Sequence, residues 1–315
     1  MNRKRDKTRS SICISMLLFT MISFPLAGQM RSSEEEGKVL IIASCQFPVS
    51  NDIMGNAKWI MYQMEEAHAL GASLAHFPEC ALSGYPGVDM KTMEGFQWRM
   101  LHHYTDSITD LARKLDMWVL LGSIHELSDT LKPLNSLYVI TPSGKIIDRY
   151  DKRFCTKGDL KYFSAGNHFV KFNINGIKCG LVICFDVRFP ELYREYKKQD
   201  VDLIFQSFYN ARQKPGGIHP KIMPVTAQTR APTNHFYISL TNSSAASSWP
   251  CHFITPDGLI RHTLPPDQPG VLISKIDLSD SYYDASRDYR GNAMEGKLYS
   301  EEAPEHPRYR NHQGR

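Results

Sequence analysis

A cysteine between an apolar run and a helical pattern is the residue of this chain best suited to chemistry. Cys184 directly follows a buried strand that the pattern predicts over residues 177–183, entered through an Asn175-Gly176 hairpin turn. Pro190 is typical of the first turn of a helix, so the thiol lies at a strand-to-helix corner. The partial positive charge of a helix N-terminus favours a nucleophilic thiolate. A buried structural cysteine is the alternative interpretation of this stretch.

Two further reactive side chains follow predicted strands. Glu79 comes after the strand at residues 74–77, and Lys152 comes after the strand at residues 145–150. Either residue alone is explained as readily by a turn, a cap or a solvated surface charge. Their shared place at strand ends, together with Cys184, is what makes them candidates for a common site.

Together these segments resemble the nitrilase, or carbon–nitrogen hydrolase, superfamily and its amidase-like branch. The signatures occur in the family's order: Pro78-Glu79 at a strand end, Lys152 before a loop, and the cysteine motif Cys184-Phe185-Asp186-Val187-Arg188-Phe189-Pro190-Glu191. Later segments continue the likeness, namely Arg230-Ala231 with Asn234, Thr241-Asn242 and the turn Pro256-Asp257-Gly258. The resemblance covers roughly residues 38–278.

The resemblance implies an α/β fold, a four-layer α-β-β-α sandwich with two mixed β-sheets flanked by helices, usually assembled as a homodimer or larger homo-oligomer. It implies a hydrolase of carbon–nitrogen bonds other than peptide bonds. A small linear amide or N-carbamoyl compound is the expected substrate, and a nitrile is less favoured within the family. Water is the second reactant.

The same resemblance implies a role for each residue of a triad. Glu79 is the general base, Lys152 is the cation beside the oxyanion, and Cys184 is the nucleophile that forms a thioester acyl-enzyme. The backbone N–H of Phe185 is the second oxyanion donor. Asp186, Arg188 and Glu191 are expected to form an ion-pair network behind the nucleophile, because charges near a core must be paired.

The sequence departs from the family at one catalytic position. Many members carry a second glutamate a few residues after the lysine, whereas Asp159 is the nearest acid here and is one carbon shorter. We therefore treat Asp159 as a candidate supporting acid. Tyr85 and the loop at 208–212, with Tyr209, Asn210 and Arg212, are candidates for the substrate pocket. Arg212 is read either as a ligand for a substrate carboxylate or as a solvated charge.

Two other functions use the same pocket. An N-acyltransferase would pass the thioester's acyl group to an amine instead of water, although the chain lacks the multiple spans of the family's membrane acyltransferases. A catalytically inactive binding module is the third possibility, and it is the weakest because all three triad residues are present.

Composition excludes several partner classes. The chain has 315 residues and a formal net charge of +4, and five of its basic residues fall within the first nine positions. No basic stripe with interleaved aromatic residues occurs, so nucleic acid is not an expected partner. No glycine-rich phosphate loop is present, and the seven cysteines lack metal-ligand spacing. We therefore expect no cofactor and no metal.

The N-terminus resembles a targeting segment. A basic cluster at residues 3–9 precedes an apolar run from Ile12 to Ile22, and the small residues Ala27-Gly28 follow. Residues 1–28 are therefore predicted to be a signal peptide or an anchor, and residues 29–37 a linker. Export to the periplasm or medium is favoured. Membrane anchoring, or a cytoplasmic protein translated from Met30, are the alternatives.

The elements that must position the site alternate between strands and helices. Further strands are predicted over 39–43, 118–122, 136–140, 201–206, 236–240 and 271–276, and helices over 51–70, 100–115 and 221–230. This alternation, with hairpins inserted, favours one layered α/β domain over residues 38–278. Residues 279–315 are polar and are predicted to form an extended tail.

Overall fold

The computed structural model describes residues 38–302, apart from residue 129 and residues 213–215. The predicted leader over residues 1–28 and the linker over 29–37 lie outside this range. No helix within the described part of the chain is long and apolar enough to cross a bilayer.

Twelve strands of the described chain form two six-stranded mixed sheets. The first sheet has the order β12-β1-β2-β3-β4-β5, with β1 (Val39–Gln46), β2 (Leu74–His76), β3 (Trp118–His125), β4 (Leu134–Ile140), β5 (Ile146–Asp151) and β12 (Gly270–Asp277). The second has the order β11-β10-β9-β8-β7-β6, with β6 (Lys171–Ile174), β7 (Ile177–Ile183), β8 (Leu203–Ser207), β9 (Tyr237–Thr241), β10 (His252–Ile254) and β11 (Ile260–Thr263).

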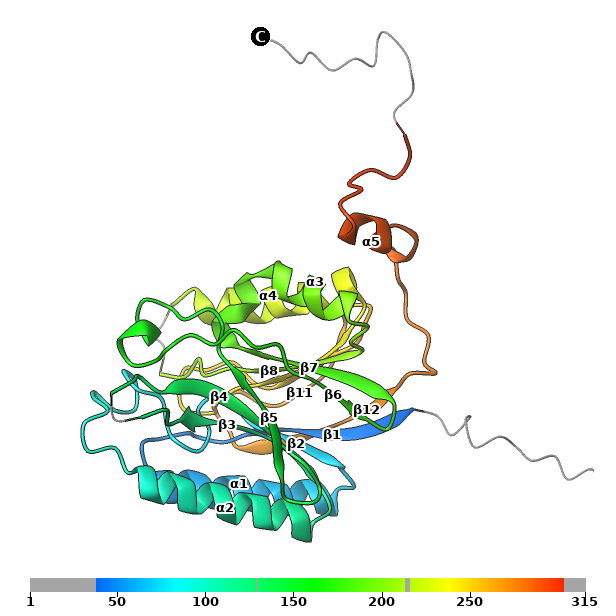
Figure 1. The fold of residues 1–315 in the computed structure, drawn as a ribbon. Coiled ribbons are helices and arrows are strands. Elements are labelled where there is room, and N and C mark those ends of the chain that lie inside the picture. The colour runs from blue at the N-terminus through cyan, green and yellow to red at the C-terminus, as the bar shows by residue number, and fades with distance from the viewer. Residues whose placement is uncertain (1–37, 129, 213–215, 303–315) are drawn as a thin grey trace, which may run out of the picture. The chain divides into compact units, whose positions relative to one another are not determined.

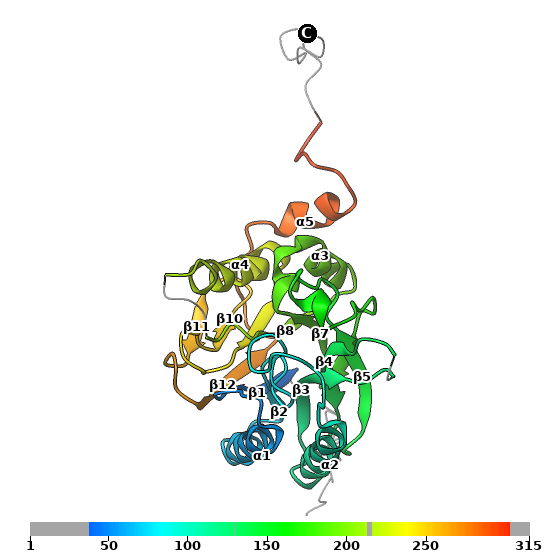
Figure 2. The same cartoon turned by 90° about the vertical axis from the view of Figure 1, so that its left-hand side faces the viewer.

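Helices cover the outer face of each sheet, which confirms the predicted four-layer α-β-β-α sandwich (Figure 1). The outer layers are α1 (Ile53–Ala69) and α2 (Trp98–Lys114) on the first sheet, and α3 (Pro190–Lys198) and α4 (His219–Asn234) on the second. Figure 2 shows the same four layers from the side. The parallel pairings β1–β2–β3 and β7–β8–β9 lie in the middle of their sheets.

Alternating side chains along the central strands explain the layering. In β3, Leu120 packs into the core between the sheets, whereas Val119 and Leu121 pack against the helical layer of α1 and α2. Successive side chains of a strand point to opposite faces, and both faces of this sheet are covered. A continuous apolar run, not an alternating one, is therefore what such a strand requires.

Most predicted elements are present. Among them, the predicted hairpin at Asn175-Gly176 joins β6 to β7, and both turn residues have positive φ. Three elements differ from the prediction. The helix predicted to begin at Pro190 is preceded by a 3₁₀ turn, η2 (Cys184–Arg188), so the first helical turn at the thiol belongs to η2. Helix α4 is longer than the prediction and contains three prolines, one in its first turn and two in its interior. The segment after residue 279 contains a helix, α5 (Arg287–Met294).

A buried histidine lies between the two sheets. His76 is fully buried at the end of β2, and its ring nitrogens lie 2.9 Å from Ser239 Oγ and 3.0 Å from Ser207 Oγ, both on the second sheet. Burial lowers the pKa of His76 to about 3 because the protonated ring would lose its hydration. The neutral ring therefore cross-links the sheets just before the chain reaches Glu79.

This histidine predicts a pH-dependent stability. In the unfolded chain His76 takes up a proton near pH 6.5, but in the folded state it does so only near pH 3. Stability from the neutral ring is present above pH 6.5 and is lost as the pH falls, by about 1.4 kcal/mol per pH unit. Urea unfolding of the wild type and of His76→Gln between pH 7 and 4.5 measures it. We expect a steeper loss in the wild type, and parallel curves would contradict the assignment.

Candidate active site

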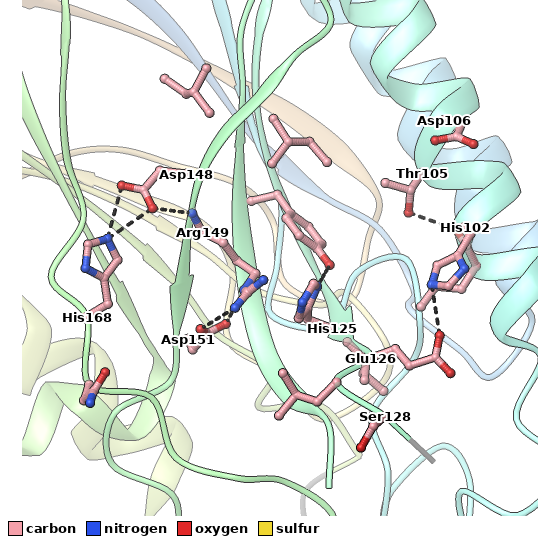
Figure 3. A pocket seen from close by; sticks show the side chains of 17 residues that line it. His102, Thr105, Asp106, His125, Glu126, Ser128, Asp148, Arg149, Asp151 and His168 are labelled. Atoms are coloured by element: carbon pink, nitrogen blue, oxygen red, sulfur yellow. Dashed lines mark hydrogen bonds and ion pairs between the residues drawn. The ribbon is translucent and has the colours of Figure 1, made fainter. Parts of the chain in front are cut away.

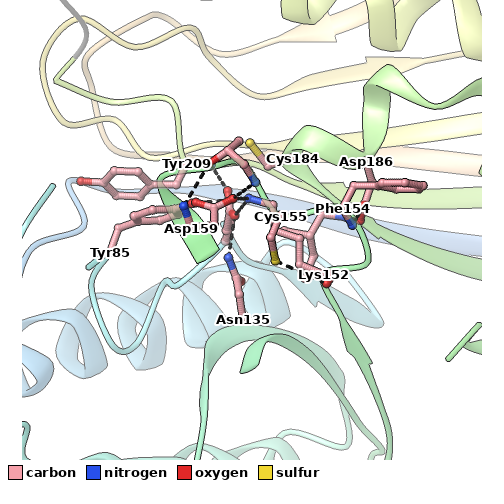
Figure 4. Close-up of polar contacts among 12 residues, drawn as sticks. Tyr85, Asn135, Lys152, Phe154, Cys155, Asp159, Cys184, Asp186 and Tyr209 are labelled. Carbon is pink, nitrogen blue, oxygen red and sulfur yellow. Dashed lines mark hydrogen bonds and ion pairs between the residues drawn. The ribbon is translucent and has the colours of Figure 1, made fainter. Parts of the chain in front are cut away.

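The three residues of the predicted triad, which the sequence places at separate strand ends, lie together in the structure. Figure 4 shows Lys152 and Cys184 within this cluster. Glu79 follows β2 and Lys152 follows β5, both in the first sheet, whereas Cys184 follows β7 in the second. Lys152 Nζ lies 2.8 Å from Glu79 Oε1, and the Cys184 thiol is close enough to the same carboxylate for the carboxylate charge to raise the pKa of the thiol. The two facing sheets therefore deliver one acid, one cation and one thiol to a single place.

Three donors hold the Glu79 carboxylate. Oε1 accepts hydrogen bonds from Lys152 Nζ and Asn135 Nδ2, each at 2.8 Å, and Oε2 accepts one from the backbone N–H of Tyr209 at 2.9 Å. Burial of the carboxylate raises the pKa of Glu79, the nearby Asp159 charge adds to this, and Lys152 opposes it. None of these three N–H groups can accept a hydrogen bond from Glu79. A proton on the carboxyl group must therefore sit on Oε2, on the side that the Tyr209 N–H does not occupy.

Lys152 lies between two carboxylates. Its Nζ is 2.9 Å from Asp159 Oδ2 and 3.4 Å from the hydroxyl of Tyr85, in addition to its contact with Glu79. Burial of the ammonium lowers its pKa, but the surrounding anions outweigh burial and raise the pKa of Lys152 well above its usual value. The side chain therefore remains a cation although it is only 1% exposed.

Asp159 reaches the lysine despite its short side chain. It opens the 3₁₀ turn η1 (Asp159–Lys161), and Oδ2 also accepts the Thr156 N–H at 2.9 Å. The Tyr85 hydroxyl donates to its Oδ1 at 2.6 Å and so fills part of the space that a longer acid would occupy. Burial opposes ionisation of Asp159, but Lys152 and these hydrogen bonds lower its pKa.

Cys184 occupies a strained backbone position at the start of η2. Its φ of 41° lies in the left-handed region, which a side chain rarely adopts outside constrained functional turns. The side-chain amide of Asn210 lies 3.4 Å from the sulfur. Burial and then the charge of Glu79 raise the pKa of the thiol, and Lys152 only partly offsets them. The expectation that the corner favours a thiolate is therefore wrong, and the resting group is a thiol.

Hydrogen bonds to Asp186, not ion pairs, fix the nucleophile turn. The carboxylate accepts from the N–H groups of Ile183 at 3.1 Å and Phe154 at 2.9 Å, and from the Tyr150 hydroxyl at 2.8 Å. No ion pair joins it to Arg188 or Glu191 in the described structure, so the expected network behind the nucleophile is wrong. Asp186 instead ties the turn that bears Cys184 to the segment just after Lys152.

The predicted pocket residues lie around this cluster. Tyr85 and Tyr209 stack with ring centroids 5.0 Å apart, and Asn210 contacts the thiol. Phe185 follows the nucleophile, and its N–H lies in the first turn of η2, where helical acceptors are absent. Arg212 is not a free solvated charge, because its Nε lies 3.0 Å from Asp89 Oδ1.

Two residues of the site were not identified from the sequence. Asn135 lies inside β4 and donates to Glu79, and its backbone oxygen accepts the N–H of Lys152 at 2.8 Å. Asp89 is bonded to both pocket loops. An amide side chain inside a mainly apolar strand is a signal that could have marked Asn135, whereas Asp89 sits in an irregular loop with no periodic pattern.

A hollow of about 1070 Å³ lies away from this cluster, along the outer part of the first sheet between α2 and β5 (Figure 3). None of the predicted site residues lines it. Most of its ionisable groups pair with one another: His102 with Glu126, His168 with Asp148 and Arg149 with Asp151. Because these charges already compensate each other, size alone does not make this hollow the reaction site.

Fold and site together define a class of two-sheet α/β sandwich proteins with a glutamate, a lysine and a cysteine at strand ends. The family model described as carbon-nitrogen hydrolase matches residues 41–283. This match covers more than half of the chain, so the chain belongs to the carbon–nitrogen hydrolase family. It is an enzyme of the amidase-like branch of the nitrilase superfamily.

Individual relatives agree with this membership. The chain is 25% identical over 278 residues to Nitrilase homolog 2 of Dictyostelium discoideum, covering 83% of this chain and 82% of that protein. It is 25% identical over 208 residues to Omega-amidase NIT2 of Homo sapiens, covering 63% and 72%. An amidase crystal structure from Nesterenkonia sp. superposes with a TM-score of 0.68 at 18% identity, covering 82% and 96%, and shows the shared fold.

Close packing of the backbone at Gly122 determines how near the segment that carries Glu79 lies to strand β3. A Cβ at this position in β3 would lie 1.9 Å from the carbonyl oxygen of Pro78 and 3.0 Å from the N of Cys80. The Gly122 carbonyl oxygen also accepts the N–H of Leu82 at 3.0 Å. Only a glycine allows the segment that carries Glu79 to approach the strand this closely.

We expect Gly122→Ala to lower turnover by roughly 100-fold, because displacement of a reacting group by about 1 Å has an effect of this size. The matched control is Gly291→Ala in α5, where a new Cβ meets nothing within 4 Å and the backbone needs no positive φ. Steady-state kinetics and thermal unfolding of both variants provide the test. A Gly122→Ala enzyme as active as the control would contradict the packing argument.

Proposed function

We propose that the chain hydrolyses small linear amides or N-carbamoyl compounds through a thioester on Cys184, with Glu79 as general base and Lys152 at the oxyanion. The observation that carries the proposal is the buried Glu79 carboxylate, which lies 2.8 Å from the ammonium of Lys152 and whose charge raises the pKa of the Cys184 thiol. The names of relatives, among them an omega-amidase and a deaminated glutathione amidase, support an amide as the substrate class.

The protonation state of Cys184 explains why the mechanism needs a base next to the sulfur. The thiol is neutral at rest because burial raises its pKa. Attack on a carbonyl carbon therefore requires that the S–H proton leave as the S–C bond forms. Glu79 Oε2 is the proton acceptor, since within the described structure Oε1 already accepts two hydrogen bonds and Oε2 accepts only one.

Acylation then proceeds without net loss of a proton. The carbonyl oxygen becomes an oxyanion, which Lys152 Nζ and the N–H of Phe185 stabilise, each donor contributing about 3 kcal/mol. Glu79 returns its proton to the nitrogen of the tetrahedral intermediate. The C–N bond breaks, the amine or ammonia leaves, and the acyl group remains on Cys184 as a thioester.

Deacylation repeats these steps with water. Glu79 takes a proton from water as its oxygen attacks the thioester, and the same two donors hold the second oxyanion. Collapse breaks the C–S bond, and the proton on Glu79 passes to the departing sulfur. The products are the carboxylic acid and the original thiol, so Glu79 and Cys184 finish in their starting protonation states.

The direct test is ammonia release by the purified enzyme from a panel of amides, N-carbamoyl compounds and nitriles. Cys184→Ala and Cys184→Ser should each lose at least about 100-fold of the activity, because neither side chain supplies a thiol nucleophile. Cys155→Ala is the matched control, because this partly buried thiol lies outside the proposed triad and its hydrogen bonds are to the backbone oxygens of Lys152 and Ser164. Rapid quenching and mass spectrometry should find the substrate's acyl group on Cys184. Retained activity in both Cys184 variants would refute the mechanism.

We expect Asp159→Asn to lower kcat/KM by roughly 10- to 100-fold, because it removes one of the two carboxylates that neighbour the buried lysine. The Asp159 charge helps to raise the pKa of Glu79, so its removal should lower that pKa. If Glu79 must be ionised to act as base, the acid limb of kcat/KM moves to lower pH. Asp148→Asn, which changes an acid on strand β5 that does not contact Lys152, is the control. An unchanged rate and profile would leave Asp159 without a supporting role.

A further inference from the structure

A buried carboxylate outside the triad joins the two loops that hold the triad in place. The Asp89 side chain is only 1% exposed and accepts three hydrogen bonds. Its Oδ2 accepts the backbone N–H of Tyr85 at 2.8 Å. Its Oδ1 accepts the Tyr209 hydroxyl at 2.6 Å and Arg212 Nε at 3.0 Å.

Each bonded loop supports a different part of the site. Tyr85 donates its hydroxyl to Asp159 and lies 3.4 Å from Lys152 Nζ. Tyr209 donates its N–H to Glu79, and the next residue, Asn210, contacts the sulfur of Cys184. The two tyrosine rings also stack, so a shift of one loop would displace the other.

We propose that Asp89 is a positioning residue for amide hydrolysis, which holds the Tyr85 and Tyr209 loops in register so that Glu79, Lys152 and Cys184 keep their geometry. The inference rests on the proposed function and adds a residue to it. Asp89 acts through the tyrosines and does not touch the three reacting groups.

Electrostatics explain why the carboxylate is accompanied by an arginine. A buried carboxylate without a cation is costly, and Arg212 supplies the compensating charge while its side chain remains 44% exposed. Arg212 Nη2 also donates to the Val49 carbonyl oxygen at 3.1 Å, which anchors the loop to the segment after β1. In this assignment Arg212 is part of the loop anchor and is not a ligand for a substrate carboxylate.

The test compares Asp89→Asn, Tyr209→Phe and the double variant with the wild type. Asp110→Asn, at an exposed ion pair of α2, is the matched control. Two readouts are followed: kcat and KM for an amide substrate, and the rate at which iodoacetamide alkylates Cys184, measured by peptide mass spectrometry. Alkylation needs no turnover, so it remains informative if the enzyme hydrolyses none of the amides tested.

We expect Asp89→Asn to lower kcat and the alkylation rate roughly 10- to 100-fold, because a neutral thiol depends on a correctly placed Glu79. Tyr209→Phe should act in the same direction, and the double variant should be little worse than Asp89→Asn, since both changes break one connection. Asp110→Asn should match the wild type. If Asp89→Asn fails to fold cooperatively, Tyr209→Phe decides by the same two readouts.

Two results would overturn the proposal. A rise in KM for carboxylate-bearing amides, with kcat and alkylation unchanged, would assign Asp89 and Arg212 to substrate binding. Additive effects in the double variant would show that the carboxylate and the tyrosine act separately. Absence of amide hydrolysis in the wild type would count against the proposed function alone, because the alkylation rates still report the geometry around Cys184.

Discussion

The buried ammonium of Lys152 is the constraint on which the rest of the site depends. It lies between Glu79 and Asp159 at 2.8 and 2.9 Å, and it is almost completely removed from water. Loss of either carboxylate would leave a buried charge without one of its partners, which destabilises proteins by several kcal/mol. Lys152, Glu79 and Asp159 therefore stabilise one another only when all three are in place, and the surrounding backbone must position all three side chains.

The sandwich meets this requirement by using strand ends. Glu79 and Lys152 come from the first sheet and Cys184 from the second, so their spacing follows from how the sheets face each other. Strand ends are rigid but leave side chains free to project. Gly122 sets the approach of one strand end, and Asp186 ties the other two together through Ile183 and Phe154.

The sequence predicts the fold well, and also the strand ends that bring Glu79, Lys152 and Cys184 together, because both rest on local patterns. The apolar run at residues 177–183 is long and uninterrupted, and β7 has the same bounds. The contact of Asn135 with Glu79 and the contact of Asp89 with Tyr209 were not predictable in this way, because they join residues 56 and 120 positions apart. The thiol's protonation was misjudged for the same reason. A helix start is visible in sequence, but the depth of burial and the approach of Glu79 are tertiary properties.

Suppression of the thiolate extends beyond the nucleophile. Burial raises the pKa of all six cysteines in the described part of the chain, and none of them is in a disulfide. Oxidation and disulfide exchange proceed through the thiolate, so these groups are protected at neutral pH. In the mechanism proposed above, Cys184 becomes nucleophilic only when Glu79 removes its proton, and the partner for that step is a carbonyl carbon held beside Lys152. The same burial that weakens the thiol therefore makes its reactivity depend on bound substrate.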